Sequence, residues 1–136
     1  MSMHARRRSG WCTALLTAGL TALSLWTGPS LAADRPSDVA QQLQAQAGFH
    51  GGFVVHLGCG TGELTAALRT NPAVQVHGLD RDPANVSAAR DVITAAGVYG
   101  PVSVDRLNGN RLPYVDNLVN LLIAEDLGGV AIEDVH

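Results

Sequence analysis

The residues best suited to chemistry are a glycine-rich run and one carboxylate that follows it. The run Gly58-Cys59-Gly60-Thr61-Gly62 joins an apolar stretch to a helix-forming one, and Asp80 ends the next apolar stretch, 22 residues after Gly58. Glycines let the backbone approach a ligand closely, and free amide groups at a helix start can face a negatively charged group. A carboxylate at this separation can accept hydrogen bonds from both ribose hydroxyls of a nucleoside. The pattern therefore predicts an adenosine site.

The spacing of the glycines disfavours two other phosphate-containing ligands. The dinucleotide fingerprint places its third glycine at position 63, where this chain has Glu63, and a pyrophosphate would meet that anion. No Gly-Lys-Ser or Gly-Lys-Thr occurs, which excludes a P-loop. A nicotinamide-dependent oxidoreductase is kept only as a second alternative.

The elements that would position these residues alternate between strand and helix. Such an order predicts a doubly wound, mainly parallel α/β sheet, a Rossmann-like arrangement. The first helix is expected to be capped by Ser37, with Val39, Leu43 and Ala47 on its buried face, and the third helix to bury Val86, Ala89, Ile93 and Ala96. The expected helices are 38–47, 63–69 and 82–96, the expected strands are 53–57, 74–79, 101–105 and 118–123, and Asp116-Asn117 is expected to be a turn.

The end of the chain predicts that more protein follows. Ile132 to His136 reads as the opening of another helix. With the strand order 3-2-1-4, the nearly continuous apolar strand 118–123 would be a bare edge, which proteins avoid because it invites aggregation. We expect the chain to be the N-terminal part of a larger fold; a complete four-stranded domain is the alternative.

The first 32 residues are typical of a secretory signal peptide. Arg6, Arg7 and Arg8 precede an uncharged, largely apolar stretch, which ends in Gly28-Pro29 and a run of small residues up to Ala33. We therefore expect a signal peptide over residues 1–32, a domain over 33–136 and export to the periplasm or the exterior, with no stable membrane span after cleavage. An uncleaved membrane anchor is the alternative.

The charge of the remaining chain argues against a nucleic-acid partner. After Ala32 there are six arginines, no lysine and twelve acidic residues. Such a surface repels a phosphate backbone.

Three segments of the chain resemble motifs of class I S-adenosylmethionine-dependent methyltransferases. They are His56–Gly62, Gly78–Asp80 and the stretch Asn108–Asn117, which contains Leu112-Pro113-Tyr114, and the resemblance covers about residues 37–135. It implies S-adenosylmethionine as cofactor and methyl transfer to an unknown acceptor. More loosely, the chain resembles methyltransferase-like segments at the front of exported proteins that continue into a β-propeller, which implies such a domain as a partner.

The same resemblance assigns the cofactor-binding residues. Gly58, Cys59, Gly60 and Gly62 would lie against the methionine moiety, Asp80 would hold the ribose and Asn108 would contact the adenine. His56 stands where the family commonly has an acidic residue that supports the ammonium end of the cofactor. This difference, together with export, makes a non-catalytic scaffold or ligand-sensing module the first alternative to an enzyme.

Catalytic and metal-binding residues are less well defined by the sequence. Methyl transfer from a sulfonium mainly requires alignment of the acceptor, so no catalytic side chain is obligatory. Glu125 and Asp126 follow the last strand and are weak candidates for a base, since acids after a strand are more often helix caps or solvated. His56, Cys59 and His77 lack the dense spacing of metal ligands, so we expect no metal.

Overall fold

The computed structural model describes residues 34–125 and 127–131 of the 136-residue chain. The predicted signal peptide, residues 1–32, lies outside the described residues, and so does Asp126. The elements, in chain order, are α1 (Pro36–Gln46), β1 (Gly52–Leu57), α2 (Glu63–Ala67), β2 (Val74–Asp80), α3 (Pro83–Ala95), β3 (Val102–Arg106) and β4 (Leu121–Ala124).

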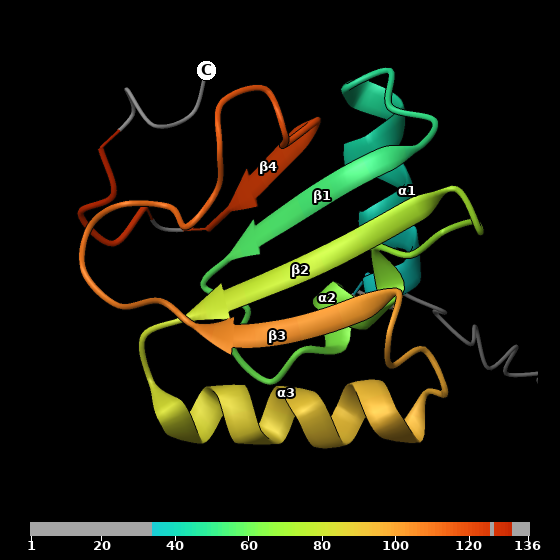
Figure 1. Cartoon of the computed structure of the whole chain (residues 1–136). Coiled ribbons are helices and arrows are strands. Elements are labelled where there is room, and N and C mark those ends of the chain that lie inside the picture. Colours follow the sequence, from blue (N-terminus) through green and yellow to red (C-terminus); the bar gives the residue numbers. More distant parts are fainter. Residues whose placement is uncertain (1–33, 126, 132–136) are drawn as a thin grey trace, which may run out of the picture. The chain divides into compact units, whose positions relative to one another are not determined.

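The four strands form one parallel sheet in the order β3-β2-β1-β4, as the sequence predicts (Figure 1). After β1 the chain builds outward in one direction through β2 and β3. It then returns across the sheet to place β4 on the other side of β1. The sheet therefore reverses its strand order between β1 and β4, and in open α/β sheets ligands bind outside the carboxyl ends of the strands at such a point.

The apolar side chains of each strand alternate between the two faces of the sheet, because successive side chains of a strand point to opposite sides. Val54, Val76 and Val104 belong to the core under the helices. Val55, Leu57, Leu79 and other side chains belong to a second core on the opposite face. This alternation of the strand side chains gives the sheet one core on each face.

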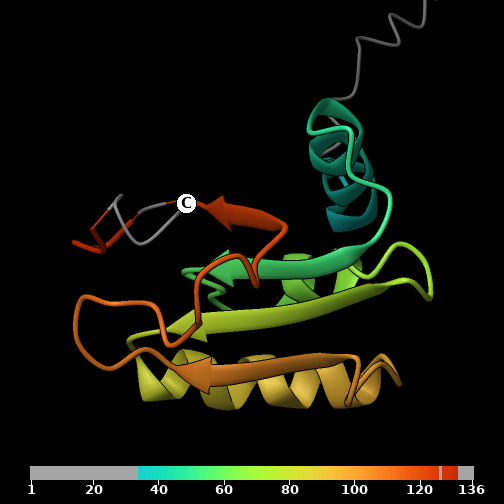
Figure 2. The ribbon, with the colours of Figure 1, turned by 45° about the horizontal axis from the view of Figure 1, so that its top comes forward.

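Among the described residues, all three helices contribute to the same core. It contains Ala40 from α1, Leu68 after α2, and Val86, Ala89 and Ile93 from α3. Figure 2 shows α2 and α3 along one side of the sheet. Asp82 caps α3 by accepting a hydrogen bond from the Ala84 amide at 2.8 Å, as its position before Pro83 predicts.

The opposite face is covered by the connection between β3 and β4 and by residues 127–130. Leu112, Tyr114, Leu127 and Val130 pack there. The Tyr114 hydroxyl lies 2.7 Å from Nδ1 of His77, and the Tyr114 ring meets Phe53 edge to face. Through these contacts the long connection is fixed on the sheet.

Four local predictions about elements are wrong in detail. Ser37 lies inside α1, whose N-cap is Arg35 without a side-chain bond. The helix buries Ala40 and Gln44, while Val39 and Leu43 are partly buried and Ala47 is exposed. Ala96 follows α3 and is exposed, because the chain leaves the sheet at that turn. Leu118 is 46% exposed, and β4 begins only at Leu121.

The turn predicted at Asp116-Asn117 is present, with Asn117 at a φ of 63°, a left-handed conformation that asparagine tolerates. Within residues 34–125 and 127–131, no helix has the length and apolar character needed to cross a bilayer.

Candidate binding site at the carboxyl ends of the strands

The glycine-rich loop connects the carboxyl end of β1 to α2, and its glycines serve different purposes. A Cβ at Gly62, where φ is 84°, would lie 2.6 Å from the Cβ of Ala89 on α3, so only glycine allows this contact between loop and helix. A Cβ at Gly58 or Gly60 would meet no atom within 4 Å. The backbone at these two positions therefore borders open space that a ligand can enter.

The amide groups of this loop are used inside the protein. The Gly58 and Cys59 amides donate to the Leu79 carbonyl at 2.8 and 3.2 Å, and the Gly62 amide donates to the Cys59 carbonyl at 2.9 Å. The Gly60 amide donates to Oδ2 of Asp80 at 3.0 Å. The expectation that free amides face an anionic ligand is wrong for these four groups. Because these amides donate to acceptors within the protein, they are not free to bind a phosphate group.

Asp80 lies where the loop, the end of β2 and the start of α3 meet. Its Oδ2 accepts from the Gly60 amide and, at 3.2 Å, from the Asn85 side chain, while Oδ1 accepts from the Asp82 amide at 2.8 Å. A carboxylate offers about four acceptor positions, so these three donors leave room for a ligand hydroxyl. The predicted convergence of Asp80 and the glycine loop is confirmed; its contact with a ribose stays a prediction.

An apolar hollow opens beside Asp80. Its volume is about 150 Å³, and Gly58 forms part of its wall. The other lining residues are Leu57, Leu79, Asp80, Arg81, Leu107, Leu127 and Gly128. Arg81 closes one side by donating to the Gly128 carbonyl at 2.7 Å. Apolar walls with one carboxylate at the edge suit a flat ring system attached to a hydroxylated sugar.

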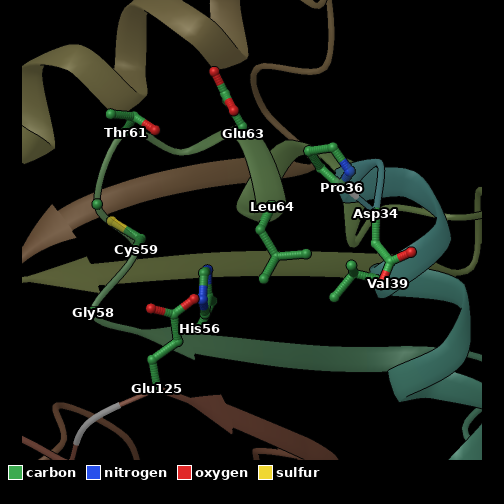
Figure 3. A pocket seen from close by; sticks show the side chains of 11 residues that line it. Asp34, Pro36, Val39, His56, Gly58, Cys59, Thr61, Glu63, Leu64 and Glu125 are labelled. Carbon is green, nitrogen blue, oxygen red and sulfur yellow. The ribbon is translucent and has the colours of Figure 1, made fainter. Parts of the chain in front are cut away.

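A larger and more polar hollow lies on the other side of the same loop. Its volume is about 360 Å³. Figure 3 shows how side chains from the start of α1, from the glycine loop and α2, and from the ends of β1 and β4 surround it. The lining residues are Asp34, Pro36, Val39, His56, Gly58, Cys59, Gly60, Thr61, Glu63, Leu64 and Glu125.

His56 and Cys59 are the two buried titratable groups of this polar hollow. Burial lowers the pKa of His56 below its ordinary value of 6.5, although Glu125 and Asp80 act in the opposite direction. The imidazole is therefore neutral at pH 7. Burial, with a contribution from Asp80, raises the pKa of the Cys59 thiol to about 11. Cys59 is thus a protonated thiol at neutral pH, which does not suit a nucleophile.

The remaining predicted site residues are placed less closely together. Glu125 lines the polar hollow, and Asp126 lies outside the described residues. Asn108 is exposed and is not among the residues that line either hollow; its neighbour Leu107 is. In the described part of the chain, no three His, Cys, Asp or Glu side chains are grouped so that they could hold a metal ion.

Several residues of this site were not predicted from the sequence. Asn85 supports Asp80, Thr65 contacts His56, and Leu107 forms part of the apolar hollow. Asn85 could have been found, because it lies in the first turn of α3, which begins at Pro83, three residues after Asp80. Leu107 and Thr65 carry no such signal, since their contacts depend on how the folded elements pack against one another.

The parallel sheet and the reversal of its strand order at β1 define a Rossmann-like α/β domain. The two hollows at that point form its candidate binding site. A family model described as a methyltransferase domain matches residues 54–136. Since this match covers more than half of the chain, the chain belongs to that family of methyltransferase domains.

Individual relatives are similar to the chain over part of their length. The O-methyltransferase resE of Aspergillus sclerotiorum is 29% identical over 114 residues, which are 76% of this chain and 42% of resE. The chain spans less than half of that relative.

Two solved structures have the same fold. One, from Methanococcus maripaludis and provisionally assigned as an S-adenosyl-L-methionine-dependent methyltransferase, superposes with a TM-score of 0.60 at 21% identity over 66% of this chain and 41% of its own. A geranyl diphosphate methyltransferase in complex with SAM gives a TM-score of 0.57 at 20% identity over 65% of this chain and 36% of its own.

Proposed function

We propose that this chain binds S-adenosylmethionine and forms the cofactor-binding part of a methyltransferase. The observation that carries the proposal is the position of the Asp80 carboxylate, bonded to the Gly60 amide and adjoining an apolar hollow at the carboxyl ends of the strands. Membership of the methyltransferase domain family supports it.

The two hollows fit the two ends of this cofactor. The apolar hollow would take the adenosine, with the free acceptor capacity of Asp80 directed at the ribose hydroxyls. The polar hollow would take the methionine end, over the open backbone of Gly58 and Gly60. Gly58 lines both, so a ligand that extends across this residue can occupy both hollows.

The main task of this chain in methyl transfer would be to hold the cofactor in position relative to the methyl acceptor. When bound, the cofactor supplies a methyl group on a sulfonium, which is already an activated leaving group. The hydrogen bonds of the glycine loop fix one wall of the site. Leu57, Leu79 and Leu107 give the hollow beside Asp80 apolar walls, which would exclude water around a bound nucleoside. The similarity to the O-methyltransferase resE supports a hydroxyl group as the first acceptor to test.

The nicotinamide alternative has less support. Glu63 occupies the position of the third glycine, and four loop amides that could face a pyrophosphate are bonded within the protein.

Calorimetric titration of the full chain tests the proposal. We expect S-adenosylmethionine and S-adenosylhomocysteine to bind with micromolar affinity, and NADH to give no heat of binding. Binding of NADH alone would establish the nicotinamide alternative. No binding of any of the three would favour a scaffold without a ligand.

The Asp80→Asn variant locates the site. Loss of charged hydrogen bonds costs about 1.5–3 kcal/mol, so we expect S-adenosylhomocysteine to bind roughly ten- to a hundredfold more weakly. Asp91→Asn, an exposed position on α3, is the matched control and should bind like the wild type. A thermal melt of both variants verifies folding. An unchanged dissociation constant for folded Asp80→Asn would remove Asp80 from the site.

We further propose that residues 1–32 direct export and that the native protein continues beyond residue 136, with a β-propeller-like domain as the kind of partner to look for. The features that support export are the three arginines, the uncharged stretch after them and the small residues up to Ala33. The chain's coverage of 42% or less of the relatives described above is consistent with a longer protein.

A further inference from the structure

The charges around the polar hollow favour a cationic ligand group. Three of its lining residues are acidic, Asp34, Glu63 and Glu125, and its lining includes no lysine or arginine among the described residues. In Figure 3 the Glu125 side chain is directed toward His56, while that of Glu63 points away toward α3. Unlike charges attract most strongly where water is partly excluded. A group such as an ammonium ion is therefore better suited to this hollow than a carboxylate or a phosphate.

One buried nitrogen in the wall of this hollow has no partner. His56 is 2% exposed, and its Nδ1 lies 2.8 Å from Oγ1 of Thr65, which is fully buried on α2. The other ring nitrogen, Nε2, makes no hydrogen bond to any described residue. Buried polar atoms are nearly always paired, so this nitrogen is available for a group that enters the hollow.

Glu125 is brought to His56 by the register of two strands that are far apart in the sequence. Ile123 of β4 pairs with His56 of β1, and paired residues of parallel strands point to the same face. Glu125 comes two residues after Ile123 and continues that face. Figure 3 shows the Glu125 carboxylate beside the imidazole, and the charge of Glu125 acts on His56.

We propose that Glu125 and His56 together bind the ammonium group of the cofactor, and that His56 can do so only in its neutral, unprotonated form. The proposal rests on the proposed function, because it assigns one end of that cofactor. In it, Nδ1–H of His56 donates to Thr65, and Nε2 accepts a hydrogen bond from the ammonium group, which also pairs with the Glu125 carboxylate. Glu125 then serves to hold the cofactor and not as a base.

The competition between the ammonium group and the proton follows from charge. A protonated His56 would pair with Glu125 itself and would repel a cation at Nε2. The other ionisable groups that face this region are Asp80 at the end of β2, Glu63 on α2, Asp34 before α1 and the Cys59 thiol. The Cys59 thiol, with a pKa raised to about 11, stays protonated, and among ordinary side chains it is imidazole whose charge changes between pH 5 and 8. His56 is thus the group whose protonation, as the pH falls below its lowered pKa, can change binding.

The direction of the pH dependence can be stated. Burial places the pKa of His56 below 6.5, so at pH 7 to 8 the imidazole is neutral and ligand affinity is at its highest. As the pH falls through the pKa of His56, the apparent dissociation constant for a ligand with an ammonium group rises, approaching tenfold for each further pH unit. A ligand without that group has no such dependence.

The experiment compares two ligands with the full chain between pH 5 and 8. S-adenosylhomocysteine carries the ammonium group, and 5′-methylthioadenosine carries the same nucleoside and sulfur without it. We expect only S-adenosylhomocysteine to bind more weakly at acidic pH. The Asp80→Asn variant should weaken both ligands at every pH, because the nucleoside is common to them.

Two variants separate the roles of the pair. Glu125→Gln should weaken S-adenosylhomocysteine at least tenfold at pH 7.5 and leave 5′-methylthioadenosine within twofold of the wild type. His56→Asn, which cannot titrate, should remove the pH dependence between pH 5 and 8. Asp91→Asn is the control for loss of one negative charge at a distance, and thermal melts verify folding. Equal pH dependence for the two ligands, or an unchanged affinity of Glu125→Gln for S-adenosylhomocysteine, would overturn the proposal. Failure of both ligands to bind the wild type would instead contradict the proposed function.

Discussion

At the scale of single residues, the glycine loop combines two different demands on glycine. Gly58 and Gly60 border open space, while Gly62 is packed against α3 so closely that any side chain would overlap Ala89. At all three positions the positive φ favours glycine, and at Gly62 the packing against α3 excludes a side chain as well. Substitution of Gly62 therefore adds a clash with Ala89 to the strain of a positive φ, whereas substitution of Gly58 or Gly60 brings only the strain.

The prediction at this scale concerns Gly62→Ala. A Cβ 2.6 Å from Ala89 forces the loop and α3 apart, and overpacking of this kind costs about 1–3 kcal/mol. Gly97→Ala is the control, because Gly97 has a similar φ of 69° and no atom within 4 Å of its Cβ position. Urea denaturation should show a lower free energy of unfolding for Gly62→Ala than for Gly97→Ala. Equal values would mean that the contact with Ala89 adds nothing to the strain of a positive φ.

At the scale of elements, the connection between β3 and β4 covers one face of the sheet. It carries Leu112, Tyr114 and Val119 onto the sheet face opposite the helices. Polar contacts hold it in place: the Tyr114 hydroxyl lies 2.7 Å from Nδ1 of His77, and Nε2 of His77 lies 3.2 Å from Oδ2 of Asp105. Burial raises the pKa of the Tyr114 hydroxyl well above its ordinary value, so it remains protonated and can donate to Nδ1 of His77.

The prediction for this element is the effect of Tyr114→Phe. The ring contact with Phe53 remains, but the hydroxyl bond to His77 is lost, at a cost of about 0.5–1.5 kcal/mol. Tyr99→Phe removes a hydroxyl from a tyrosine that is 63% exposed and should leave stability unchanged. Urea denaturation of the two variants measures the difference. If both are as stable as the wild type, the hydroxyl of Tyr114 does not anchor the connection.

At the scale of the whole molecule, the chain has two parts with different compositions. Residues 33–136 contain every acidic residue, while residues 1–32 contain three arginines and a long uncharged stretch. The proposed export raises the question of where this domain would meet S-adenosylmethionine, a cofactor made inside the cell. The answer depends first on whether residues 1–32 direct export and are removed.

The prediction at this scale is cleavage after Ala32. In a host with a secretory pathway, the exported protein should begin at Ala33, which N-terminal sequencing of the secreted fraction will determine. Leu16→Arg places a charge in the uncharged stretch and should keep the protein inside the cell at full length. A wild-type chain that stays intact in the membrane fraction would support the anchor, and one that stays intact in the cytosol would contradict export.

Much of the fold could be predicted from the sequence because it depends on local patterns. The alternation of apolar residues gives the strands, Asp82-Pro83 gives the start of α3, and the order of elements gives a parallel sheet. The buried face of α1 could not be predicted. Gln44 is buried because its amide donates to the Leu68 carbonyl at 2.6 Å and accepts from Thr70 at 2.6 Å, and both partners follow α2. A polar side chain is buried when distant atoms satisfy it, and a local pattern contains no record of those atoms.

For the site, the sequence alone determined that a glycine loop and the Asp80 carboxylate belong to one place, because both follow neighbouring strands of a parallel sheet and must meet at its carboxyl edge. Only the tertiary structure decided that the loop amides are bonded within the protein and that His56 has a free buried nitrogen beside Glu125. The physical reason is the distance along the chain. The pairing of β1 with β4 joins residues more than sixty positions apart, and that register, which sets the chemistry of the polar hollow, exists only once the sheet has formed.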